Sequence, residues 1–361
     1  MNKNYYAIIM AGGIGSRFWP ISRTSHPKQF IDILGTGKTL IQNTYDRFLK
    51  ICPKENIYIV TNEIYTDLVK KQLPDMADDQ ILTEPVMRNT APCIAYGSFK
   101  IESINPDASI VVAPSDHLIL DEAAFVNAIE KSLKVVSEND CLITLGIKPS
   151  RPDTGYGYIQ YTDNALKSDF YKVKTFTEKP TLEIAKTFLQ SGDFLWNAGI
   201  FVWSAKAIVN AFSQHLPDMH EIFADSRPVY NTPDEKNHIH KTYLQCTNIS
   251  IDYGIMEKAD NVYVLPSEFG WSDLGTWASI YELAEKDYVG NAVIPAEKVI
   301  MYDSSNCMVN VPGEKLVILQ GLHDFIVVES NNTLLICPRD QEQNVKKVVA
   351  DVKQQFGTKY I

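Results

Sequence analysis

Short apolar runs alternate with segments of helical periodicity over the first part of the chain. Apolar runs that end in a polar or glycine-rich turn predict strands, and apolar residues at a spacing of three to four predict helices. The strands predicted are 6–10, 57–61, 109–113 and 141–146, and the helices are 40–49, 64–72, 91–102 and 123–137. Strands alternating with helices indicate βαβ units, so we expect an α/β fold with a doubly wound, mostly parallel, Rossmann-like sheet.

The pattern changes after about residue 285. Short β-like runs separated by turn residues follow one another, at 299–302, 307–311, 316–320, 325–329 and 333–337. A last helix would carry Val345, Val348, Val349, Val352 and Phe356 on one face. We therefore expect a main domain over residues 1–285 and a small β module with a terminal helix over 286–361. The module either contacts a second copy or packs within the monomer.

Composition excludes several classes of protein. The chain has 361 residues, 22% of them charged, and a net charge of −10, which disfavours binding to the anionic backbone of nucleic acids. Apolar runs stay far below the roughly 18 residues of a membrane span, so we expect a soluble, cytoplasmic protein without a membrane partner. The six cysteines lack the spacing of a zinc site or a disulfide framework, and we expect reduced thiols.

A glycine-rich loop follows the first predicted strand. It reads Ala11-Gly12-Gly13-Ile14-Gly15-Ser16-Arg17, and Pro27-Lys28-Gln29-Phe30 comes shortly after it. The dinucleotide pattern fails here because its third glycine would be Phe18, and a Walker A pattern ending at 37–39 would need a glycine at Asp32. Backbone N–H groups with two cations nearby suit a triphosphate whose pyrophosphate departs. A surface turn with solvated cations is the alternative.

These segments resemble the opening motif of the sugar-nucleotide pyrophosphorylases. The Trp19-Pro20-Ile21-Ser22-Arg23 and Pro27–Phe30 stretches resemble the mannose-1-phosphate guanylyltransferase branch in particular. The resemblance implies a GT-A-type nucleotidyltransferase core and a C-terminal module like a left-handed β-helix, used in homodimers. It also implies that Arg17 and Lys28 stabilise the leaving pyrophosphate, and that the loop holds base and phosphates through Ala11, Gly12, Gly13 and Gly15.

Two further segments present acids. Pro114-Ser115-Asp116-His117 follows a predicted strand, and Trp271-Ser272-Asp273-Leu274-Gly275 places an aspartate among aromatic residues. Either aspartate alone is more often a cap or turn residue. Both segments match the family's metal-binding segments, however, and the resemblance makes Asp116 and Asp273 ligands of Mg²⁺, or of Mn²⁺ or another divalent cation, with Ser115 at the nucleotide.

The sugar phosphate is expected at a group of later motifs. A lysine before a proline, as in Glu178-Lys179-Pro180, suits one phosphate oxygen as a point charge. By resemblance Lys179 binds the sugar 1-phosphate and Glu178 reaches a sugar hydroxyl. The stretches 155–158, 196–199 and 250–254 also match the family, which places Gly155, Asn197 and Asp252 around the sugar. Tight turns within a core are the alternative.

The segment from Glu84 to Ala91 matches the family's base-recognition segment. A carboxylate at Glu84 can accept hydrogen bonds from the N1–H and exocyclic amine of guanine, and Asn89 and Thr90 can complete the set. Asn89 is also a good N-cap for the helix that follows, and the two roles are compatible.

The motifs together imply transfer of GMP from GTP to mannose 1-phosphate, giving GDP-mannose and pyrophosphate. Three alternatives stay open on the sequence. The first is a related pyrophosphorylase that uses another hexose 1-phosphate or nucleotide, and the second is a non-catalytic relative that binds GDP-mannose. The third is an NAD-dependent oxidoreductase, which Phe18 in place of the third glycine disfavours.

Overall fold

The computed structural model describes residues 1–167 and 169–361. The described chain divides into two compact units. Unit 1 comprises residues 1–12, 44–115 and 119–271, and unit 2 comprises residues 13–43, 116–118 and 272–361.

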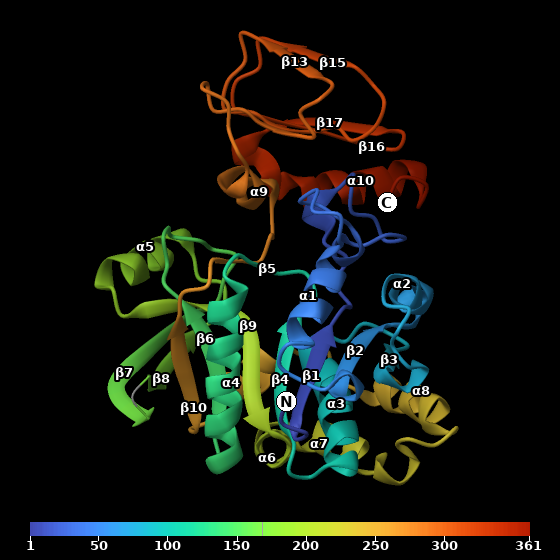
Figure 1. The fold of residues 1–361 in the computed structure, drawn as a ribbon, viewed down its shortest axis with the longest axis vertical. Helices are drawn as coiled ribbons and strands as arrows, with labels where there is room; N and C mark the ends of the chain where they lie inside the picture. The colour runs from blue at the N-terminus through green and yellow to red at the C-terminus, as the bar shows by residue number, and fades with distance from the viewer. Residues whose placement is uncertain (168) are drawn as a thin grey trace. The chain divides into compact units, whose positions relative to one another are not determined.

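Unit 1 is built on a nine-stranded sheet of order β3-β2-β1-β4-β9-β6-β10-β8-β7 (Figure 1). The pairs β3–β2, β2–β1, β1–β4 and β6–β10 are parallel, while β9 is antiparallel to both β4 and β6. The pairs β10–β8, β8–β7 and β7–β9 are also antiparallel. The sheet is therefore parallel-rich, as the apolar runs predicted, with an antiparallel part formed by β7, β8 and β9. The strands are β1 (Tyr5–Met10), β2 (Ile57–Asn62), β3 (Ile81–Glu84), β4 (Ser109–Pro114), β6 (Leu142–Ile147), β7 (Tyr158–Lys167), β8 (Phe170–Thr177), β9 (Phe194–Ser204) and β10 (Val262–Ser267).

Helices pack on the sheet because successive strand residues point to opposite faces. Ile8 of β1 lies in one buried cluster with Ile94 of α3 and Phe212 of α6, while α4 packs along β4 and β9 (Figure 1). The predicted helices are confirmed, with the first turn of the one at 64–72 formed as a 3-10 turn. The helices are α1 (Leu40–Phe48), α2 (Thr66–Gln72), α3 (Thr90–Ile104), α4 (Glu122–Glu138), α5 (Leu182–Ser191), α6 (Ala205–His215), α7 (Pro217–Ala224) and α8 (Glu235–Gln245).

Unit 2 contains the β module predicted at the C-terminal end. Strands β12, β14 and β16 pair in parallel, β17 closes that sheet in antiparallel fashion, and β13 pairs in parallel with β15. Parallel pairing between consecutive coils gives the β-helix-like arrangement expected from the resemblance. The elements are α9 (Trp277–Leu283), β12 (Ala292–Ile294), β13 (Val299–Tyr302), β14 (Met308–Asn310), β15 (Val317–Gln320), β16 (Phe325–Ser330), β17 (Thr333–Pro338) and α10 (Val345–Phe356).

The terminal helix α10 packs against the second half of the glycine motif. Val345, the first residue of the helix, forms a buried cluster with Trp19 and Leu335, and Val348, Val349 and Val352 pack on its edge. Phe356 does not continue this face, because it is 60% exposed and its ring meets that of Tyr360 instead.

Hydrogen bonds join the same segments. The Trp19 indole donates to the carbonyl of Tyr360 at 2.7 Å. The Arg23 guanidinium donates to the carbonyl of Ser330 at 3.0 Å and to the hydroxyl of Thr333 at 3.1 Å. The β module therefore has a packing role within the monomer, and this role explains the tryptophan and arginine of the motif.

In the described part of the chain, no helix combines the length and the apolar character needed to cross a bilayer. All six cysteines are free thiols, as expected, and five of them are buried.

Candidate active site

The glycine loop begins where β1 ends. Ala11 is held in unit 1, because its N–H donates to the carbonyl of Val60 at 2.7 Å and its carbonyl accepts from the Thr61 hydroxyl at 2.8 Å. A side chain at Gly12 would lie 3.4 Å from Glu84 Oε2, whereas one at Gly13 would meet open space. The loop therefore has an unobstructed stretch of backbone at Gly13.

Gly15, in unit 2, can only be glycine. Its φ is +66°, and a Cβ there would lie 2.6 Å from the Cβ of Lys28. The missing side chain lets the loop pass directly over the stem of Lys28. Arg17 follows in a 3-10 turn that spans Ser16–Phe18, and its buried Nε has no hydrogen-bond partner among the described residues. Arg17 is thus a cation whose Nε–H donor is not used by any described protein group.

Lys28 is a buried cation and is fully occupied by protein atoms. Its side chain is 4% exposed, and its ammonium lies 2.8 Å from Asp116 Oδ2, 2.8 Å from the carbonyl of Asp273 and 3.0 Å from the carbonyl of Leu274. The Phe18 ring centroid lies 5.5 Å away, within cation–π range. We call Lys28, Asp116, Asp273 and Leu274 the Lys28 cluster. A contact of Lys28 with the leaving pyrophosphate stays a prediction.

The two predicted metal-binding aspartates both belong to the Lys28 cluster. Burial opposes the ionisation of Asp116, but the charges of Lys28 and His117 outweigh it and lower the pKa of its carboxyl. The Asp273 carboxylate accepts the N–H of Gly275 at 2.8 Å, and a side chain at Gly275 would displace that carboxylate. Among the described residues no group of three or more acidic, His or Cys side chains could hold a metal. Two carboxylates nevertheless fit Mg²⁺, which commonly takes one or two from protein and further oxygens from phosphates and water.

The expected base-binding segment lies in unit 1 at the end of β3. Glu84 is buried, which raises the pKa of its carboxyl to about 7 against a smaller opposing effect of the Tyr243 hydroxyl. Its Oε1 has no hydrogen-bond partner among the described residues. Asn89 is the N-cap of α3 and accepts from the Thr90 N–H at 2.9 Å, while the Thr90 hydroxyl accepts from the Ile251 N–H at 2.9 Å. The cap role of Asn89 is thus present in the structure.

Ser115 has a structural position. Its side chain is buried, its N–H donates to the carbonyl of Met10 at 3.0 Å, and its carbonyl accepts from Thr44 at 3.1 Å. These bonds tie the end of β4 to the end of β1. A contact of Ser115 with nucleotide stays a prediction.

The residues expected around the sugar meet in unit 1. The Asn197 amide donates to Asp252 Oδ1 at 2.9 Å and its oxygen accepts from the Thr144 hydroxyl at 3.0 Å, which fixes the orientation of the amide. Glu178 forms an ion pair with Lys179, whose side chain is 58% exposed. Burial and the charge of Glu178 raise the pKa of Asp252 to about 6. We call Asp252, Asn197, Glu178 and Lys179 the Asp252 cluster.

Two features of this region were missed by sequence reasoning. Gly157 leaves the space that the Glu178 carboxylate occupies, and a Cβ there would displace Glu178 Oε2. Gly155, which the sequence singled out, donates its N–H to Asp153 at 2.8 Å in an exposed turn, and its contact with a sugar stays a prediction. Lys179 has a left-handed backbone (φ +48°), which no residue pattern indicated. Gly157 belongs to the stretch 155–158, which matches the family. The close approach of Glu178 to Gly157 is a tertiary contact, and the sequence alone could not show which of the two glycines makes it.

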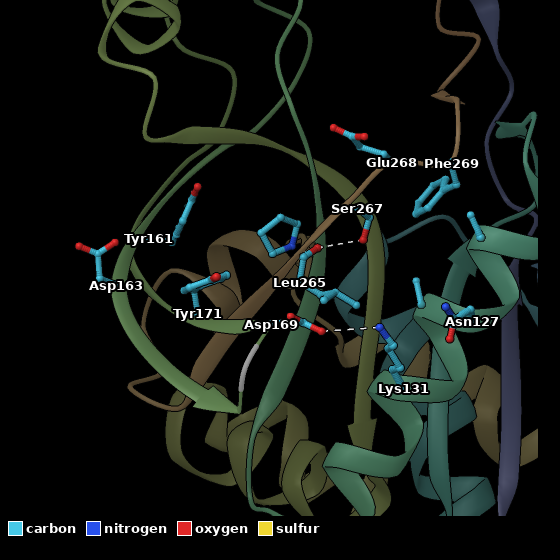
Figure 2. Close-up of a pocket in the computed structure, with 13 residues that line it drawn as sticks. Asn127, Lys131, Tyr161, Asp163, Asp169, Tyr171, Leu265, Ser267, Glu268 and Phe269 are labelled. Atoms are coloured by element: carbon cyan, nitrogen blue, oxygen red, sulfur yellow. Dashed lines mark hydrogen bonds and ion pairs between the residues drawn. The ribbon is translucent and has the colours of Figure 1, made fainter.

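A cavity of about 540 Å³ elsewhere in unit 1 contains none of the predicted site residues. Figure 2 shows it lined by α4, β7, β8 and the end of β10, with Lys131 paired to Asp169 at 3.6 Å. Its carboxylates at Asp163 and Asp169 are exposed. These residues serve below as controls outside the candidate site.

Comparison with known proteins identifies the family. The Nucleotidyl transferase family model matches residues 6–289, and a model described as a MannoseP isomerase/GMP-like beta-helix domain matches residues 297–352. The chain is 35% identical over 359 residues to the alginate biosynthesis protein AlgA of Pseudomonas aeruginosa, covering 96% of this chain and 72% of that protein. It is 35% identical over 360 residues to a mannose-1-phosphate guanylyltransferase of Escherichia coli, covering 98% of this chain and 75% of the relative.

A solved structure agrees over nearly the whole chain. The crystal structure described as a mannose-1-phosphate geranyltransferase from Thermus thermophilus matches with a TM-score of 0.86 and 29% identity, covering 97% of this chain and 99% of that one. The chain therefore belongs to the nucleotidyl transferase family, in a group that includes proteins named mannose-1-phosphate guanylyltransferase.

Proposed function

We infer that the protein transfers GMP from GTP to mannose 1-phosphate and releases pyrophosphate. The observation that carries this function is the identity of about 35% to a named mannose-1-phosphate guanylyltransferase over 98% of the chain. The Lys28 and Asp252 clusters support it, because each combines a cation with carboxylates at the motifs expected for nucleotide and sugar phosphate.

The reaction needs no general base. A phosphate monoester has a second pKa near 6, so mannose 1-phosphate is largely dianionic at neutral pH. One of its oxygens forms a bond to the α-phosphorus of GTP while the bond from that phosphorus to the bridging oxygen of pyrophosphate breaks. Catalysis then depends on orientation and on stabilisation of the departing charge.

The chain's own residues divide these tasks. Lys179 orients the attacking phosphate, since its side chain is 58% exposed and can reach a bound ligand. Glu178, Asn197 and Asp252 hold sugar hydroxyls. Arg17, whose Nε lacks a protein partner, receives the negative charge that builds up on pyrophosphate.

The nucleotide is held by the loop and by the segment after β3. The open backbone at Gly13 leaves room for phosphate oxygens, and Glu84 offers an unpaired carboxylate oxygen for the donors of guanine. Asp116 and Asp273 would hold a divalent cation, with Mg²⁺ favoured, and the cation would neutralise phosphate charge when bound.

We further propose a homodimer, residues 1–285 as transferase domain and 286–361 as β module. The module exposes apolar side chains at Ile300, Tyr302, Leu316 and Ile318 on and beside β13 and β15, a surface that a second copy would cover. A cytoplasmic location stays a prediction from the sequence.

A substrate panel tests the function. The purified chain is incubated with GTP, ATP, UTP or dTTP and with mannose 1-phosphate or glucose 1-phosphate, and pyrophosphate release is followed. We expect GTP with mannose 1-phosphate to react at least tenfold faster than any other pair. A faster reaction of another pair would change the assigned substrate, and absence of release from every pair would rule out the transferase in favour of a binding protein.

A further inference from the structure

The loops that carry the candidate pyrophosphate and metal residues belong to the same compact unit as the β module. Unit 2 contains Arg17, Asp116 and Asp273 as well as the module, although these residues lie in three separate stretches of the sequence. Glu84 and the Asp252 cluster belong to unit 1. The packing of the module is therefore continuous with that of one part of the candidate site.

Buried side chains next to two of these residues pack against the module. Phe18 follows Arg17, Leu274 follows Asp273, and both side chains are fully buried. They belong to one buried cluster to which the module strands β12, β14 and β16 contribute Ala292, Met308, Ile326 and Val328. Leu274 also has a left-handed backbone (φ +44°), which persists at a leucine only where the surroundings hold it. The module therefore anchors the chain directly beside Arg17 and Asp273.

Helix α9 connects the loop of Asp273 to the module. The helix begins at Trp277, whose indole ring meets the Phe18 ring edge-on with the centroids 5.1 Å apart. The next residue, Ala278, donates its N–H to Glu342 Oε2 at 2.8 Å. An N–H in the first turn has no acceptor within its own helix, and a carboxylate at that end interacts favourably with the helix dipole. Glu342 thus fixes the start of the helix that follows the loop.

A second contact from the module holds the other end of the helix. Glu342 lies in a 3-10 turn (Arg339–Asn344), and the Arg339 guanidinium at the start of this turn lies 3.7 Å from the centroid of the Tyr281 ring. The same guanidinium donates to the carbonyl of Asn306 at 2.8 Å, and the Tyr281 hydroxyl donates to the carbonyl of Gly290 at 2.7 Å. Helix α9 is therefore held by module residues at both ends.

We infer that the β module is the scaffold that positions the Asp273 loop (residues 272–276), and that Glu342 is its positioning residue. Glu342 acts through α9 and takes no part in the bonds that form and break. This role is separate from a contact between two copies, since all the contacts above lie within one chain. The inference rests on the proposed function for the reaction, whereas the order of the loop can be measured without substrates.

Two substitutions at Glu342 test the inference. Glu342→Ala removes the acceptor at the start of α9, while Glu342→Gln keeps an oxygen that can accept the same N–H. Because displacing a catalytic group by about an ångström costs up to roughly 100-fold in rate, we expect Glu342→Ala to lower kcat roughly 10- to 100-fold. The Mg²⁺ concentration at half-maximal rate should rise at least fivefold, with the KM for mannose 1-phosphate changed less than twofold. Glu342→Gln should keep at least a third of the activity.

Hydrogen exchange on the protein without metal or substrate gives a readout that does not depend on turnover. In Glu342→Ala, exchange in residues 273–279 should speed up at least fivefold, while exchange in residues 299–328 stays as in the unmodified protein. The matched control is Glu314→Ala, which removes a 96% exposed acid of the same module. It should change neither exchange nor activity by more than twofold, and light scattering should give one oligomeric state for all four proteins.

Several results would overturn the inference. A kcat of Glu342→Ala within twofold of the unmodified protein, unchanged exchange at 273–279, or equal losses in Glu342→Ala and Glu342→Gln would each do so. A loss of activity that comes with faster exchange throughout the module, or with a change of oligomeric state, would do so as well. Inactivity of the unmodified protein in the substrate panel would refute the proposed function, and the exchange measurement would still decide whether Glu342 holds the loop.

Discussion

The two clusters contain the same kinds of residues and differ in what those residues can do. In the Lys28 cluster the lysine is 4% exposed and bound to three protein acceptors. In the Asp252 cluster Lys179 is 58% exposed and is paired with Glu178 alone among the partners that the structure records. The comparison teaches that a lysine in a sequence motif identifies a charge but not its protein partners. These depend on how deeply the tertiary structure buries the side chain.

The aspartates differ in the same way. The Asp116 side chain is 26% exposed, and the cations beside it keep the pKa of its carboxyl below the usual range. Asp252 is partly buried, and desolvation together with the charge of Glu178 raises the pKa of its carboxyl to about 6. The neighbours of Asp116 stabilise its ionised form. The surroundings of Asp252 oppose ionisation, although at neutral pH its carboxyl is still mostly ionised.

The largest effect is expected from Asp116→Asn. This change removes one of the two carboxylates that would hold the divalent cation and also the ionic partner of Lys28. By analogy with loss of one electrostatic group at a transition state, turnover should fall roughly 10²- to 10³-fold. Pyrophosphate release at saturating substrates measures it.

The matched control is Asp163→Asn, an exposed acid at the cavity shown in Figure 2, which should stay within twofold of the unmodified protein. Retention of a tenth or more of the activity by Asp116→Asn would remove this carboxylate from the reaction. The Lys28 cluster would then be no more than a structural ion pair.

Sequence reasoning reached the fold because the information for it is local. The apolar runs at 6–10 and 109–113 are continuous, as parallel strands buried on both faces are, and they became β1 and β4 almost residue for residue. The positions of the loops at the strand ends follow from that sheet. Glycine and proline in the motifs likewise marked the turns.

The roles within the clusters could not be predicted in this way. Two of the three acceptors of Lys28 are backbone carbonyls 245 and 246 residues away, and every residue type has a carbonyl. The left-handed backbone at Lys179 and Leu274 is uncommon for both residue types, so their local sequence argues against it. Such features come from tertiary packing and become visible only in the structure.

A smaller effect is expected from Lys179→Ala, which should affect one substrate only. Loss of a charge-assisted hydrogen bond of about 1.5–3 kcal/mol would weaken mannose 1-phosphate binding roughly 10- to 100-fold. Because the Lys179 side chain is exposed, its removal should not disturb the packing of the protein, and the affinity for GTP should change less than threefold. Calorimetric titration of each ligand separately measures both affinities.

Lys131→Ala is the matched control for this titration, since Lys131 is about half exposed and paired with an acid outside the candidate site. It should alter neither affinity. Equal losses of GTP and mannose 1-phosphate affinity in Lys179→Ala would contradict the assignment of Lys179 to the sugar phosphate and would make the two clusters alike.

The smallest effect concerns stability, and its sign distinguishes the two aspartates. The pKa of Asp252 is about 6 in the folded protein and 3.8 for the ordinary carboxyl, so between these values the folded state binds the proton more tightly than the unfolded state does. The stability that this group contributes is therefore present below pH 3.8, falls as pH rises, and is lost above pH 6.

Asp252→Asn removes this charge and should raise the free energy of unfolding by about 1–2 kcal/mol at pH 7.5, with the gain shrinking towards zero near pH 4. Urea unfolding at several pH values measures this difference. If Asp252→Asn is less stable than the unmodified protein at pH 7.5, favourable contacts stabilise the ionised Asp252 and the proposed cost of its charge is refuted. We expect such a loss of stability for Asp116→Asn, whose carboxyl has a lowered pKa.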